Sequence, residues 1–270
     1  MKKNIDIFFK ILFITCLFVF IYFLLNIVKW DKENKKNKKL DNDIKTNTTV
    51  IEKDNFDNTV FVNPDNNKNS LYWHYAGMKM IDVDLNNLRQ LNNDVSGWIQ
   101  VPGTDIDYPF VQAKNNKYYL NHSIDKSYND AGWIFLDYRN DYKLDNKNNI
   151  LYGHARRDGT MFGSLKNVLK KTWFTNKDNH VIKISTPYEN SLWQIFSVYY
   201  IETESYYITV NFKDKSDYLE YINTSLERSI YRFDSNVNGE DTILTLSTCH
   251  GEKKKLVVQA KLIKKEIKSS

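Results

Sequence analysis

A run of 18 residues without a charged side chain, Ile11 to Val28, constrains this chain more than any other feature of its sequence. A helix of that length rises by about 1.5 Å per residue and nearly crosses the hydrocarbon core of a bilayer, and residues 5–9 extend it. A cleaved signal peptide is the alternative, but its apolar core is shorter and is followed by a cleavage site of small residues. The sequence therefore predicts an uncleaved transmembrane anchor at residues 11–29, preceded by a tail of residues 1–10.

Charge does not decide the orientation of that anchor. Six lysines lie between Lys29 and Lys39, so a simple positive-inside count would keep the following domain in the cytoplasm. That rule loses force when one long domain follows a first, signal-like helix. Charge alone leaves the topology open.

The rest of the chain divides into a polar segment and a region able to fold. Residues 30–70 are rich in Asn, Lys and Asp and lack apolar periodicity, which predicts a flexible linker. Hydrophobic residues make up 41% of the 270 residues and charged residues 26%, so the remainder is able to bury a core. We expect one folded domain at residues 71–266 and a short tail at residues 267–270.

Composition and motifs exclude several classes of function. The net charge is only +5, and lysine is spread along the whole chain rather than gathered with aromatic residues, so nucleic-acid binding is not expected. The two cysteines, Cys16 and Cys249, are too few for a disulfide framework or a cysteine-rich zinc site. Metal-binding motifs and phosphate-binding loops are absent from the sequence, so we expect no metal and no cofactor.

Short apolar runs separated by turn residues indicate strands. The predicted strands are residues 97–101, 106–112, 132–136, 149–153, 180–185, 192–201, 242–248 and 256–263. A helix is predicted over residues 216–230, where Leu219, Ile222, Leu226 and Ile230 recur at helical spacing. This pattern is typical of a mostly β fold with helical insertions, either a barrel or a sandwich.

Cys249 is the candidate nucleophile. It ends a predicted strand where the chain enters a polar turn, and it is the only thiol outside the apolar run. A lone thiol on an exported domain is exposed to oxidation, which favours a reactive role, although an inert thiol stays the alternative. Cys16 lies inside the apolar run and is interpreted as a small apolar residue.

A cysteine nucleophile needs a nearby base or cation, because neutral pH alone provides little thiolate. Among the five histidines, His154 is the best candidate, since it follows a predicted strand and opens a loop. His74, His122 and His180 lie near polar loop or strand-start positions, where a solvated imidazole is expected. His250 adjoins the cysteine, but neighbouring strand residues point to opposite faces.

An acyl-transfer site also needs positive charge or N–H donors where the oxyanion develops. Lys253, Lys254 and Lys255 follow Cys249, and Lys255 opens the predicted strand 256–263. This strand lies beside the strand of the cysteine if the two pair as a hairpin. A solvated lysine turn is the alternative interpretation.

Five motifs in order resemble the sortases, and within them class B. The sequence TLSTC at residues 245–249 is similar to the sortase TLxTC signature, and residues 152–154 with 158–165 resemble the class B segment around the catalytic histidine. The remaining three, which resemble the first strands of the family, are residues 97–109, 118–122 and 132–139. The resemblance extends from about Leu85 to Ile263.

The resemblance implies an eight-stranded sortase β-barrel preceded by N-terminal helices. It implies a place on the outer face of a Gram-positive membrane, with the N-terminus in the cytoplasm. The implied activity is that of a cysteine transpeptidase that cuts surface proteins after the threonine of a C-terminal sorting signal, often of the type Asn-Pro-x-Thr. The protein is then joined to an amine of a lipid II-type peptidoglycan precursor.

The resemblance also implies roles for individual residues. Cys249 would form a thioester, His154 would act as acid and base, and Ser247 and Thr248 would contact the substrate. The third catalytic residue of the family is an arginine that opens the strand after the cysteine, and the matching residue here is Lys255. Lysine carries the charge without the planar fork of donors. Arginines that could substitute from elsewhere are Arg139, Arg156, Arg157 and Arg232.

Two other functions stay open at this point. A pilin-type polymerase would use the same cysteine and histidine but would accept a lysine of another subunit as the amine. A catalytically weakened, sortase-like module would only bind the cell wall. The presence of both Cys249 and His154 favours an active enzyme.

Overall fold

The computed structural model describes residues 2–54, 58–202, 204–249 and 254–268, of which residues 2–6 and Cys249 are described by their backbone alone. The chain divides into two compact units, residues 1–47 and residues 48–270. The first unit is the helix α1 (Lys2–Asn47). The second unit carries the sheets described below.

The apolar run of the sequence lies within α1. An 18-residue window of this helix has a mean hydropathy of 2.8 and is not buried in the protein, so α1 is long and apolar enough to cross a membrane. The structure differs from the sequence prediction over residues 30–70. Residues 30–47 continue the helix, with ion pairs of i,i+4 spacing such as Asp31–Lys35. Residues 48–70 belong to the second unit and contain two strands.

Those two strands attach the start of the second unit to its sheets. The strand β1 (Val50–Lys53) pairs antiparallel with β3 (Met80–Val83). The strand β2 (Thr59–Phe61) pairs with the C-terminal part of the last strand, β11 (Lys255–Ile267). The ring of Phe61 also contacts Trp73 edge to face, at 5.4 Å between ring centroids. The apolar residues 60–62 therefore anchor an otherwise polar segment.

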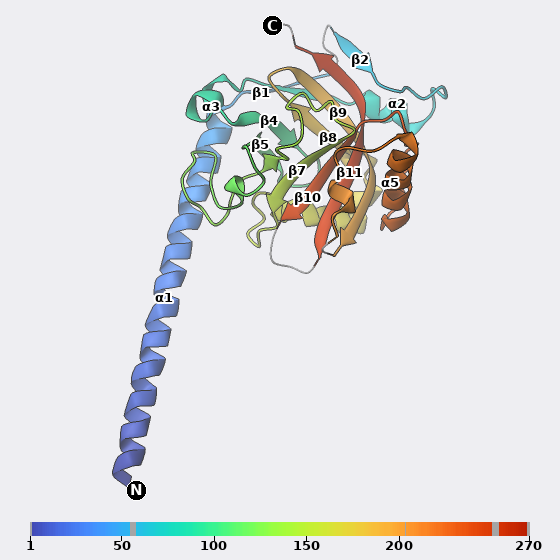
Figure 1. Cartoon of the computed structure of the whole chain (residues 1–270). Helices are drawn as coiled ribbons and strands as arrows, with labels where there is room; N and C mark the ends of the chain where they lie inside the picture. The colour runs from blue at the N-terminus through green and yellow to red at the C-terminus, as the bar shows by residue number, and fades with distance from the viewer. Residues whose placement is uncertain (1, 55–57, 203, 250–253, 269–270) are drawn as a thin grey trace. The chain divides into compact units, whose positions relative to one another are not determined.

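Eight strands form a closed barrel (Figure 1). Besides β11, they are β4 (Val95–Gln100), β5 (Asp107–Val111), β6 (Phe135–Leu136), β7 (Asn148–His154), β8 (Val181–Ser185), β9 (Glu189–Ile201) and β10 (Ile243–Cys249). They follow one another as β10-β7-β6-β5-β4-β8-β9-β11, and the pairing of β10 with β11 closes the ring. The predicted eight-stranded sortase barrel is confirmed.

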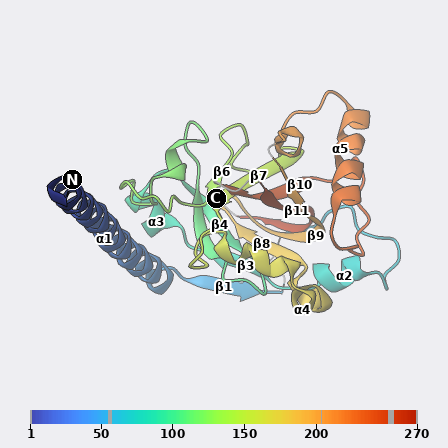
Figure 2. The same cartoon turned by 90° about the horizontal axis from the view of Figure 1, so that it is seen from below.

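Short helices connect the strands. They are α2 (Leu71–Ala76), α3 (Asn86–Leu91), η1 (Tyr118–Leu120), η2 (Gly163–Leu169), α4 (Lys171–Thr175), η3 (Lys177–Asn179) and η4 (Tyr206–Ile208). The longest helix of this unit, α5 (Lys215–Arg228), lies along the outside of the barrel (Figure 2). The side chain of Asp214 caps it by accepting from the backbone N–H of Asp217 at 3.0 Å.

The helix predicted over residues 216–230 is confirmed, but its buried face agrees with the predicted one only in part, at Ile222. Tyr218, Tyr221 and Ile222 pack against Phe196 of β9 and Ile243 of β10. Leu226 and Ile230, which were expected on this face, are 38% and 50% exposed. The aromatic rings, which bury more apolar area than aliphatic side chains, decide which face turns to the barrel.

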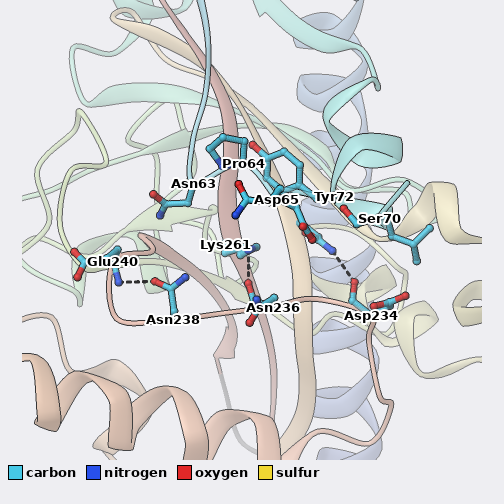
Figure 3. A pocket seen from close by; sticks show the side chains of 13 residues that line it. Asn63, Pro64, Asp65, Ser70, Tyr72, Asp234, Asn236, Asn238, Glu240 and Lys261 are labelled. Carbon is cyan, nitrogen blue, oxygen red and sulfur yellow. Dashed lines mark hydrogen bonds between the residues drawn. The ribbon is translucent and has the colours of Figure 1, made fainter. Parts of the chain in front are cut away.

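A polar cavity of about 320 Å³ lies between the segment that precedes α2 and the loop that precedes β10 (Figure 3). Lys261 of β11 lines it, although only 4% of this residue is exposed. Its ammonium donates to the backbone carbonyl of Asn236 and lies 3.8 Å from a carboxylate oxygen of the fully buried Asp241. Asn63 donates to the same carboxylate at 2.9 Å. This buried cluster ties the start of the unit to the barrel.

Removal of the ammonium should therefore be costly. We expect Lys261→Met to lower the free energy of unfolding by about 3–5 kcal/mol, because the Asp241 carboxylate would stay buried without its counter-charge. Urea unfolding of the full chain in detergent, followed by tryptophan fluorescence, measures this loss. Lys215→Met is the matched control, since its ion pair with Glu240 at the same cavity is more than 60% exposed on both sides. The control should cost about 0–1 kcal/mol. Equal losses in the two variants would contradict this account.

Candidate active site

The pairing of three strands brings the predicted catalytic positions together. The strand β10 runs parallel to β7, and in this register Cys249 pairs with His154. On its other side β10 runs antiparallel to β11, where Ser247 pairs with Val257. The described β10–β11 pairs end there, and β11 begins two residues earlier, at Lys255. Cys249 is therefore paired with His154 on one side, and the strand on its other side begins with Lys255.

A cleft with a volume of about 660 Å³ opens at this end of the barrel. Its described lining comes from η1, β6, β7, η4, β11 and the loops beside η1. The residues are Asn116, Leu120, Asn121, Tyr128, Asp130, Phe135, Tyr152, His154, Ile208 and Lys255. Among them Lys255 is the only lysine or arginine, and His154 is the only histidine. The cleft thus combines an imidazole and an ammonium with aromatic and aliphatic walls.

The imidazole of His154 is held by a backbone carbonyl. Its Nε2 lies 2.6 Å from the carbonyl oxygen of Leu120, the last residue of η1. A carbonyl oxygen only accepts hydrogen bonds, so Nε2 carries a proton in this arrangement. Any proton that this ring exchanges would then be carried on Nδ1.

The comparisons with known proteins agree with this geometry. A family model of the sortase domain matches residues 99–263. The chain belongs to the sortase family, in class B. It is 39% identical to sortase B of Listeria monocytogenes over 190 residues, which cover 67% of this chain and 75% of the relative. Identity to sortase B of Staphylococcus aureus is 37% over 181 residues, which cover 66% of this chain and 73% of the relative.

A solved structure supports the same assignment. A crystal structure of a Bacillus anthracis protein similar to sortase B superposes with a TM-score of 0.62 at 42% identity. The match covers 67% of this chain and 82% of that structure. Sortases are cysteine transpeptidases, and the predicted family, fold and activity of this chain are confirmed.

His74, His122 and His180 are not among the described residues that line the cleft. His74 is exposed and pairs with Asp178 at 3.1 Å, while His122 stacks on the ring of Tyr118 at 4.1 Å. For His180 the prediction of a solvated imidazole is wrong. It is 5% exposed, and burial lowers its pKa. Aromatic rings from separate segments enclose it, namely Tyr75, Trp173, Phe174 and Phe233. His250 lies outside the described residues.

The four arginines that could substitute for the family arginine do not line the cleft, and two of them pair with carboxylates. Arg139 donates two hydrogen bonds to the fully buried Asp137, at 2.8 and 2.6 Å, and a third at 3.0 Å to the carbonyl of Ile208. Burial alone would raise the pKa of Asp137, but the hydrogen bonds from Arg139 and Tyr152 outweigh it and lower that pKa. Arg156 is paired with Asp158. None of the four arginines is among the described residues that line the cleft.

Ser247 and Thr248 have structural contacts in the described part of the chain. The hydroxyl of the fully buried Ser247 lies 3.1 Å from that of Tyr207. The hydroxyl of Thr248 accepts from the backbone N–H of Leu256 at 2.9 Å, across the β10–β11 hairpin. Their contact with the substrate stays a prediction.

Sequence reasoning missed most of the walls of the cleft. Leu120 lies within the motif at residues 118–122, which the family resemblance included but to which it gave no role. Ile208 follows a strand in a short 3-10 turn, where no periodicity marks it. Both residues reach the cleft through tertiary structure alone.

Substitution of Lys255 tests its place as the cation of the cleft. We expect Lys255→Ala to lower kcat/KM for a sorting-signal peptide by about 10²-fold, the scale for the loss of one oxyanion stabiliser. Lys255→Arg should preserve or raise kcat/KM, because a guanidinium adds a planar fork of donors to the same charge. Steady-state kinetics of peptide cleavage measure both variants.

Lys254→Ala is the matched control for this series. Lys254 precedes Lys255 in the chain, is exposed, and does not line the cleft. Its loss should leave kcat/KM close to the wild-type value. Small and equal effects at both positions would show that the lysines form only a solvated turn.

Proposed function

We propose that this chain is a membrane-anchored sortase that cleaves surface proteins after the threonine of a sorting signal and transfers them to an amine of a cell-wall precursor. The observation that carries the proposal is the register of β10, where Cys249 pairs with His154 of β7. On the other side of β10 lies β11, which begins with Lys255 of the cleft. Nucleophile, acid and cation are the three groups that acyl transfer through a thioester requires.

The acylation step follows from these three groups. Nδ1 of His154 takes the thiol proton of Cys249. The thiolate adds to the threonine carbonyl, and the negative charge that develops on its oxygen faces the ammonium of Lys255. The tetrahedral intermediate collapses with cleavage of the C–N bond. The departing amine takes the Nδ1 proton of His154, and the threonine carbonyl stays on Cys249 as a thioester.

The transfer step reverses these roles. An incoming primary amine adds to the thioester carbonyl and gives a proton to His154. The thiolate of Cys249 then departs, and a new amide joins the threonine to the acceptor. A solved sortase B, 37% identical to this chain, is complexed with triglycine, a peptide that ends in a primary amine. It supports a short amine-bearing peptide as the acceptor here.

The walls of the cleft suit an extended peptide. Leu120, Phe135 and Ile208 offer apolar surface for a central side chain of the sorting signal, whereas Asn116 and Asn121 offer amide groups. An Asn-Pro-x-Thr type signal has this alternation of polar and apolar groups. With α1 crossing the membrane and its N-terminus in the cytoplasm, the cleft would meet such signals on the outer face.

Two substitutions test the proposed nucleophile and acid. We expect Cys249→Ala to abolish cleavage of an Asn-Pro-x-Thr peptide, because no other described residue of the cleft is a thiol. His154→Ala should lower kcat by about 10²- to 10⁴-fold, the effect of losing a general acid. A fluorogenic peptide assay with triglycine as acceptor measures cleavage and transfer together.

His122→Ala serves as the control, since His122 stacks on Tyr118 and does not line the cleft. Its activity should stay within a few-fold of wild type. Substantial turnover by the Cys249→Ala variant would overturn the proposal. Peptide binding without cleavage by the wild-type chain would instead favour a wall-binding module.

A further inference from the structure

Gly132 is packed against the hydrogen bond that holds His154. Its φ of +58° lies in the left-handed region. A Cβ at this position would lie 2.7 Å from the carbonyl oxygen of Leu120 and 2.9 Å from Cδ2 of the His154 ring. It would also lie 2.5 Å from the carbonyl oxygen of Tyr119. Position 132 therefore has no room for a side chain, because the carbonyl of Leu120 and the ring of His154, which are hydrogen-bonded to each other, occupy that space.

The surrounding backbone leaves little freedom to make that room. The N–H of Gly132 donates to the carbonyl of Asn129 at 2.9 Å, and the N–H of Trp133 donates to that of Tyr119 at 2.9 Å. The indole of the buried Trp133 donates in turn to the carbonyl of Pro109 at 2.8 Å. A methyl group at position 132 would press on the carbonyl of Leu120 and on the ring of His154, and displacement of either one disturbs the hydrogen bond between them.

Movement of the ring would change the chemistry of His154. A neutral imidazole exists as two tautomers, and a carbonyl that accepts from Nε2 selects the form with its proton there. Loss of that bond removes this selection of the Nε2–H tautomer and one constraint on the angle of the ring. A displacement of about 1 Å at a reacting group is enough to cost 10²-fold in rate.

We propose that Gly132 is a positioning residue for His154. By having no side chain, it lets the carbonyl of Leu120 reach Nε2, which fixes the tautomer and the orientation of the imidazole toward the end of β10. This inference rests on the role of His154 as the acid proposed above. Because Leu120 also lines the cleft, the same carbonyl links the substrate wall to the acid.

The test uses the full chain in detergent and compares two glycines that both have a positive φ. Gly132→Ala introduces both backbone strain and the contacts with Leu120 and His154. Gly159→Ala is the matched control, since Gly159 also has a positive φ, +85°, but the nearest atom to its Cβ would be Asp105 Oδ2 at 3.8 Å. Gly159→Ala should lose about 1–2 kcal/mol, the cost of a left-handed alanine. Gly132→Ala should lose more, because its Cβ also meets two backbone carbonyls.

We expect only Gly132→Ala to lose kcat, by about 10²-fold, with KM for the sorting-signal peptide changed less than threefold. NMR spectra of ¹⁵N-histidine-labelled protein report the tautomer of His154, and the His154→Ala variant assigns its signal. The signal should no longer be that of the Nε2–H tautomer in Gly132→Ala. It should still be that of the Nε2–H tautomer in Gly159→Ala. Gly132→Asn, which tolerates a positive φ but carries a Cβ, should behave like Gly132→Ala and is the variant to use if the alanine does not fold.

The outcomes separate this inference from the proposed function. A Gly132→Ala or Gly132→Asn variant with wild-type kcat, beside an inactive His154→Ala, would overturn the inference and leave the proposed function standing. Lost activity with an unchanged His154 tautomer would also overturn it, because the effect would then be structural only. An active His154→Ala variant would contradict the proposed function itself.

Discussion

The site depends on one constraint, the position of β10 between β7 and β11. Neighbouring strands of a sheet lie about 4.8 Å apart in the direction of their hydrogen bonds, so a residue of the central strand has close neighbours on both sides. The parallel pairing with β7 supplies His154, and the antiparallel pairing with β11 closes the barrel and supplies Lys255. The proposed catalytic arrangement is therefore a consequence of barrel closure.

Polar contacts on the face of the barrel that α5 covers reinforce this closure. The hydroxyl of Thr245 in β10 donates to the side chain of Asn148 in β7 at 2.7 Å, and Gln259 of β11 donates to the same hydroxyl at 3.3 Å. Each of these groups is fully buried, so an unpaired one would be costly. A slipped register would break these contacts, which favours the pairing that aligns Cys249 with His154.

The barrel strands and α5 could be predicted from the sequence because their apolar residues repeat with the period of a strand or helix. Cys249, His154 and Lys255 could be predicted because each lies at a strand end beside a recognisable motif.

Other features could not be predicted, because they depend on partners far along the chain. The pairing of Lys261 with Asp241 and the enclosure of His180 by aromatic rings are examples, since both residues look like surface residues in sequence. The helical structure of residues 30–47 also escaped prediction, because that segment has no apolar face.

The central claim, that Cys249 carries the substrate as a thioester beside His154, is tested most directly by trapping the acyl-enzyme. The full chain is incubated with a sorting-signal peptide in the absence of an amine acceptor, quenched in acid, and analysed by intact and peptide mass spectrometry. The account predicts that the fragment containing Cys249 gains the mass of the substrate peptide up to and including its threonine. Hydroxylamine should release this adduct. An adduct on Cys16, or cleavage without any adduct on Cys249, would contradict it.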